Sequence, residues 1–85
     1  MDNNVLDDRI YLYEGVLRIS KMQKAELEKH NEEIAGLMSA LITDEAKEEL
    51  AKITQINYKE MIELEIKLAE LEQSLKAMKG LRFLM

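Results

Sequence analysis

The chain has 85 residues, of which 47% are hydrophobic and 34% are charged, and it contains no cysteine, no proline and only three glycines. This length allows one domain, residues 1–85, and the missing cysteines exclude disulfides and thiolate metal sites. The composition predicts an all-α fold, and the net charge of −5 argues against binding to nucleic-acid phosphates.

The first predicted helix spans about residues 4–42, with Asn3 or Asn4 as its N-cap. Its apolar residues recur at spacings of three and four, which indicates a seam that packs against another helix: Leu6, Ile10, Tyr13, Leu17, Leu27, Ile34 and Met38. The segment HNEEIAG is the weak point, because Asn31 can cap a new helix and Gly36 can bend the chain. A three-helix variant therefore remains the alternative to a straight hairpin.

The second predicted helix spans about residues 44–79. Thr43 is a good N-cap, and Asp44 in the first turn suits the helix dipole. Gly80 offers the left-handed residue that commonly ends a helix. A second seam runs along this helix: Leu50, Thr54, Asn57, Met61, Leu64, Leu68, Leu71, Leu75 and Met78.

Residues 80–85 form an apolar and basic tail after the second helix. We expect Leu81, Phe83 and Leu84 to fold back over the open end of the hairpin, against Val5 and Leu6. The alternatives are docking into the groove of a partner protein or contact with an anionic membrane. The residues that would dock are Leu81, Arg82, Phe83 and Leu84.

A short connection makes the two helices antiparallel, giving a long, coiled-coil-like hairpin. Folding at Thr43 pairs positions whose numbers sum to about 88, which places Leu17 against Leu71 and Asn31 against Asn57. Two amides in one layer can satisfy each other, whereas a slip by one turn would bury each against an apolar side chain. We therefore interpret the two asparagines as a register pair; the alternative is a layer that is simply hydrated.

Each helix carries a second apolar stripe that a lone hairpin cannot cover. The candidate interface residues are Leu12, Val16, Ile19 and Met22 on the first helix and Tyr58, Ile62, Ile66 and Ala69 on the second. Exposed stripes of this extent usually mark an interface. The sequence therefore predicts a homodimer with a four-helix arrangement, in which one flank serves self-association and the other a partner protein.

No catalytic, cofactor-binding or metal-binding constellation stands out. His30 is the only histidine, whereas a di-metal site in a helical bundle requires two Glu-x-x-His units. The serines have no histidine at a plausible distance along the hairpin. We therefore expect a protein that is not an enzyme and holds neither cofactor nor metal.

Three functions remain open from the sequence. The first is a cytoplasmic protein–protein interaction module, a small acidic regulator or inhibitor similar in size and charge to those of phages and mobile elements. The second is a structural or chaperone-like component of a larger helical assembly. In shape and length the chain also resembles the secreted hairpins of the WXG100 family, but it has no tryptophan, its turn reads LITDEAK, and Ile62 stands four residues after Tyr58 where the export signal needs an acid. No secretory signal or membrane span is expected.

Overall fold

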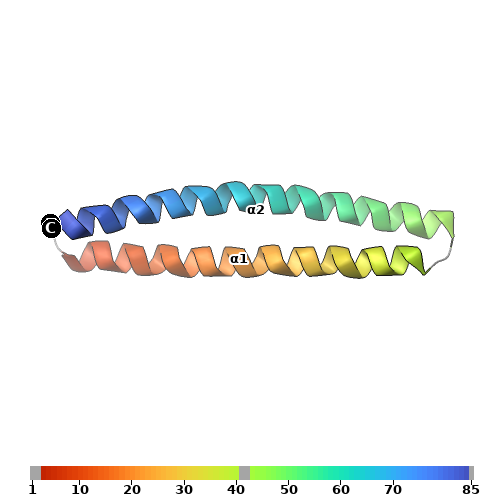
Figure 1. The fold of residues 1–85 in the computed structure, drawn as a ribbon, viewed down its shortest axis with the longest axis horizontal. Coiled ribbons are helices and arrows are strands. Elements are labelled where there is room, and N and C mark those ends of the chain that lie inside the picture. The colour runs from red at the N-terminus through yellow and green to blue at the C-terminus, as the bar shows by residue number, and fades with distance from the viewer. Residues whose placement is uncertain (1–2, 41–42, 85) are drawn as a thin grey trace.

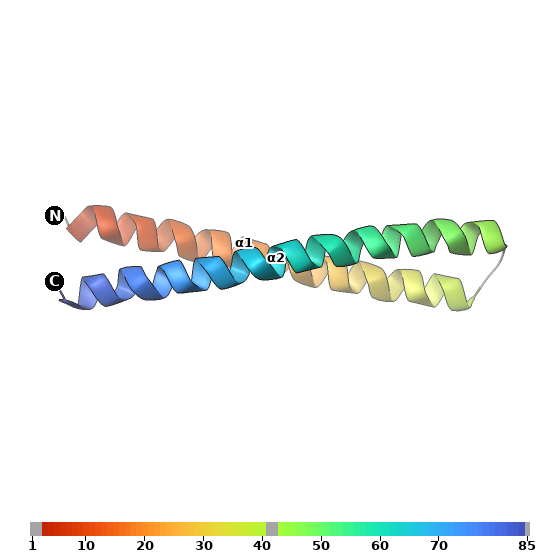
Figure 2. The same ribbon diagram turned by 90° about the horizontal axis from the view of Figure 1, so that it is seen from above.

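The protein is a two-helix hairpin in the computed structural model, which describes residues 3–40 and 43–84 (Figure 1). Helix α1 spans Asn3–Ser39 and helix α2 spans Asp44–Leu84. The two helices run antiparallel along their whole length and cross near their midpoints in the perpendicular view (Figure 2). The rod measures 62 × 14 × 14 Å. The predicted all-α hairpin is therefore confirmed.

Helix α1 is continuous through HNEEIAG and ends at Ser39, three residues before the predicted boundary. The Ala40 N–H donates to the Leu37 carbonyl at 3.2 Å, and the Ser39 hydroxyl donates to the Gly36 carbonyl at 3.0 Å. These bonds satisfy carbonyls that a helix end otherwise leaves free. One interior glycine costs a helix only about 1 kcal/mol, so Gly36 does not break α1. The proposed caps Asn3 and Asn4 have side chains outside the described set.

Helix α2 begins as predicted. The Thr43 Oγ1 accepts a hydrogen bond from the Ala46 N–H at 3.2 Å, and the Thr43 carbonyl accepts one from the Lys47 N–H at 3.2 Å. Asp44 and Glu45 lie in the first turn, where negative charge favours the positive end of the helix dipole.

The predicted end of α2 at Lys79 is wrong, because the helix continues through Gly80 to Leu84. The expected fold-back of the tail is wrong as well, since the Phe83 side chain is 90% exposed and Leu81 and Leu84 are also exposed. An ion pair links the additional turn to α1, with Arg82 Nε 2.9 Å from Asp7 Oδ1. Gly80 does not adopt the left-handed conformation that a helix-ending glycine takes.

Replacing Gly80 with alanine should therefore stabilise the protein by about 1 kcal/mol, because alanine loses less backbone entropy in a helix. The substitution is free of steric conflict, since nothing lies within 4 Å of the added Cβ. Urea unfolding followed by circular dichroism measures the change. A loss of stability would show that Gly80 has a left-handed backbone and ends the helix, because alanine is strained there.

The core is a single line of side chains between the helices. Leu6, Ile10 and Leu75 form a buried cluster at the end where the chain termini lie, and Leu17 and Met78 pack against it. Ile34 and Leu68 are buried further along the seam. Ser20 is buried on the same seam, and its hydroxyl has no hydrogen-bond partner among the described residues.

Candidate functional site

The most polar part of the seam lies near its middle, where four side chains from both helices meet. The Asn57 Nδ2 group donates to Asn31 Oδ1 at 2.9 Å and lies 3.2 Å from His30 Nδ1. The Asn31 Nδ2 group in turn lies 3.9 Å from Met61 Sδ. Asn57 is only 6% exposed, so its amide depends on these protein partners rather than on water.

His30 makes a contact in this layer that was not predicted from the sequence. His30 is exposed and stands among acidic residues on α1. The His30 Nδ1 accepts a hydrogen bond from the Asn57 Nδ2 group. In a neutral imidazole ring this places the ring proton on Nε2. The adjacent Asn31 is the only local signal that His30 lies beside the seam.

A shallow groove opens next to this layer on one side of the seam. Its lining residues are Gln23, Glu26, Leu27, His30, Glu60, Glu63, Leu64 and Lys67. The carboxylates in the groove are not gathered around a common point. Within residues 3–40 and 43–84, no group of three or more histidine, aspartate or glutamate side chains is arranged to hold a metal ion.

The opposite side of the seam carries ion pairs between the helices. Lys79 Nζ lies 3.0 Å from Glu14 Oε1, and Lys24 Nζ lies 3.2 Å from Glu65 Oε1. Lys21 Nζ lies 3.8 Å from Glu72 Oε1. Apart from Lys24, which is partly buried, these side chains are exposed, so each pair contributes at most about 1 kcal/mol. Each of these three pairs joins α1 to α2 along this flank.

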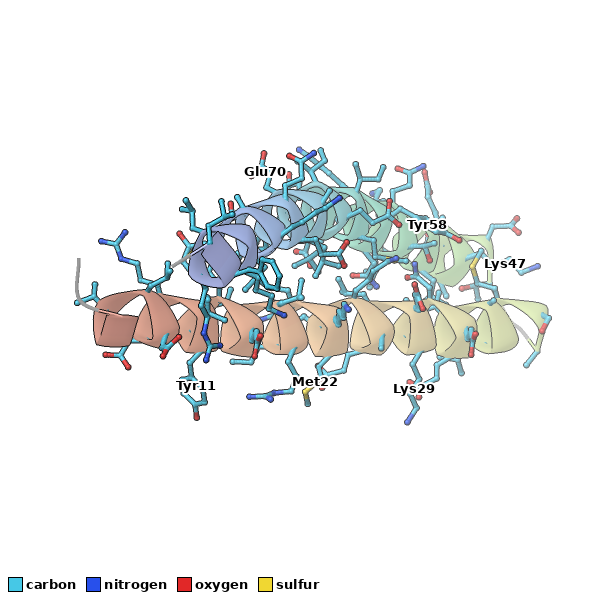
Figure 3. The ribbon with its side chains drawn as sticks, turned by 60° about the vertical axis from the view of Figure 1, so that its left-hand side comes forward. Tyr11, Met22, Lys29, Lys47, Tyr58 and Glu70 are labelled. Carbon is cyan, nitrogen blue, oxygen red and sulfur yellow. The ribbon has the colours of Figure 1, made fainter. Side chains whose placement is uncertain are left out.

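The stripe predicted on α1 is exposed. Leu12, Val16 and Ile19 follow one another at spacings of four and three, and all three lie outside the core. Met22 follows Ile19 by three residues and is exposed as well. Figure 3 shows Met22 on the face of α1 turned away from α2, together with Tyr11 and Lys29. The four residues of the α1 stripe, Leu12, Val16, Ile19 and Met22, are therefore all accessible.

The stripe predicted on α2 is exposed as well. Ile62 and Ile66 are each 57% exposed, and Tyr58 and Ala69 lie in the open beside them. The register residues Asn31 and Asn57 face the opposite way, into the seam. The structure thus divides the eight candidate interface residues between surfaces on different helices and leaves all of them accessible.

The C-terminal residues Leu81, Arg82, Phe83 and Leu84 form the last turn of α2 rather than a separate tail. No described helix is both long enough and apolar enough to cross a membrane. Comparison of the chain with protein-family models, with curated proteins and with solved structures finds no match.

Proposed function

We propose that this protein is a non-enzymatic protein–protein interaction module, an acidic helical hairpin that dimerises and regulates or inhibits another protein by binding it. The imbalance between exposed and buried apolar side chains carries this proposal. Sixteen large hydrophobic side chains of the described residues are exposed, whereas the buried core contains five hydrophobic residues. Monomeric proteins rarely leave apolar surface of this extent uncovered.

The arrangement of the exposed residues supports binding rather than simple solubility. The α1 stripe repeats at helical spacing, as do the anchors by which an amphipathic helix enters an apolar groove of another protein. Val5 continues this stripe, seven residues before Leu12, and is also exposed. The stripe lies on α1 alone, so a partner could bind there while α2 remains accessible to a second copy.

Site-specific photocrosslinking tests the proposal in the cells that produce the protein. Benzoylphenylalanine in place of Ile19 lies on the α1 stripe, whereas the same group in place of Lys29 lies on the outer face of α1 (Figure 3). We expect the Ile19 position to yield one discrete adduct with a different protein and the Lys29 position to yield none. Equal adduct patterns at both positions, or adducts of the protein with itself alone, would contradict a partner site on α1.

A further inference from the structure

The outer face of α2 carries a stripe without charge that is longer than the four apolar residues alone. Six uncharged side chains follow one another at steps of three and four residues, which keeps them on one face of the helix: Gln55, Tyr58, Ile62, Ile66, Ala69 and Gln73. All six are exposed, and the seam that packs on α1 uses other positions. Helix α2 thus has two faces suited to helix packing, of which the hairpin covers one.

This stripe is nearly symmetric about the middle of its helix. Because α2 spans Asp44–Leu84, its midpoint is residue 64. If a second copy of the stripe runs antiparallel to the first with the two midpoints opposite each other, Ile62 lies opposite Ile66 and Gln55 lies opposite Gln73. This arrangement also brings the large side chain of Tyr58 beside the small side chain of Ala69. A surface that matches its own reverse fulfils the requirement of a twofold interface, in which both copies use the same patch.

The charges along one edge of the stripe obey the same symmetry. Each follows a stripe residue directly in the sequence, and their signs alternate: Lys59, Glu63, Lys67 and Glu70. Reversal about the midpoint places Lys59 beside Glu70 of a second copy and Glu63 beside Lys67. None of the four forms an ion pair with another described residue. On the other edge, Glu65 and Glu72 are paired with lysines of α1.

We propose that a second copy of this chain binds antiparallel to the outer face of α2, about a twofold axis between Ile62 and Ile66. This inference rests on the dimer of the proposed function and assigns its surface and its orientation. The arrangement buries the α2 stripe against itself, forms four interchain ion pairs and leaves the α1 stripe free. The two connections between helices then lie at opposite ends of the dimer.

Electrostatics favour this orientation over the parallel one. Residues 44–63 carry six acids and three bases, a net charge of −3, whereas residues 65–84 carry three acids and four bases, a net charge of +1. An antiparallel pair sets each acidic half beside a basic half. A parallel pair would instead set the two acidic halves side by side, which is destabilising.

Charge reversal tests the surface. The double variant Lys59→Glu/Lys67→Glu has an entirely acidic edge, and Glu63→Lys/Glu70→Lys has an entirely basic one. We expect sedimentation equilibrium to show a dimer for the wild-type chain and a dissociation constant raised about tenfold or more for either variant alone. An equimolar mixture of the two should restore a dimer. Unchanged dimerisation of the separate variants, or a monomeric wild type, would overturn the proposal.

Cysteine pairing tests the orientation, because the natural chain contains no cysteine. Oxidising a mixture of Tyr58→Cys and Ala69→Cys chains should give the mixed disulfide, since these positions face each other only in the antiparallel dimer. Disulfides between identical chains would overturn this orientation.

Two further variants separate this inference from the proposed function. Ile66→Glu should abolish the dimer, and Ile19→Glu should leave it intact. A crosslink from position 19 that persists in Ile66→Glu would support the α1 partner site independently of the dimer. An intact wild-type dimer without any adduct from position 19 would contradict that partner site while leaving the dimer surface standing. Dimerisation that survives Ile66→Glu would overturn the surface assigned here.

Discussion

Replacing Leu75 with alanine should destabilise the hairpin by about 2–5 kcal/mol, a large part of the stability expected for a domain of this size. Leu75 is buried against Leu6 and Ile10, and it is the only member of that cluster contributed by α2. A rod of two helices has no second layer that could collapse into the cavity. Thermal unfolding at a fixed protein concentration should show a lower and broader transition.

Ile56→Ala is the matched control for this substitution. Ile56 lies on the same helix but is more than half exposed, so shortening its side chain leaves no internal cavity. We expect a change in the free energy of unfolding of about 0.5 kcal/mol or less, as for ordinary surface substitutions. Equal losses for the two variants would show that the cluster around Leu75 does not form the core of the hairpin.

Replacing Asn31 and Asn57 together with leucine should raise the melting temperature. Their 2.9 Å hydrogen bond mainly compensates for the cost of burying the amides, whereas leucines at both positions would add buried apolar surface. An increase of about 1 kcal/mol corresponds to roughly 4–8 °C for a domain of this size. A sharp decrease in the melting temperature would contradict a role in register, since the pair would then be a main source of stability.

The single substitutions should act in the opposite direction. Asn31→Leu leaves the Asn57 amide with His30 as its only partner from the layer, and an incompletely paired buried amide costs about 1–3 kcal/mol. If the pair specifies register, the double leucine variant should also populate shifted pairings. Disulfide trapping between cysteines placed one turn out of register would detect them. A double variant with one register only would assign that specificity to the rest of the seam.

The seam was predictable because its signal extends over the full length of both helices. Spacings of three and four place Leu6, Ile34 and Leu68 on the buried faces, and the structure buries all three. The contact between Asn31 and Asn57 follows from the same periodicity once the fold point at Thr43 is known. The position of the turn was predictable because a threonine followed by two acids favours the start of a helix, both by capping and by charge.

The errors lie where a local signal competes with tertiary packing. Gly80 favours a helix end only where another conformation of the following residues is more stable. Here the additional helical turn places Arg82 beside Asp7 of α1. The contact between His30 and Asn57 was not predicted, because it depends on how the two helices are rotated about their axes, which spacing along one helix does not define.

The position of the buried cluster at the end with the chain termini has a consequence for the order in which the hairpin folds. Helix pairing can propagate from the connection near Thr43, where loop closure is least costly in entropy. Leu6 and Leu75 are separated by most of the chain, so their cluster is expected to close after the layers nearer the connection. The hairpin is thus held covalently at one end and by buried leucines at the other. Separation of the helices at the open end must therefore break this buried cluster first, which favours unfolding as a single cooperative unit over fraying of the open end.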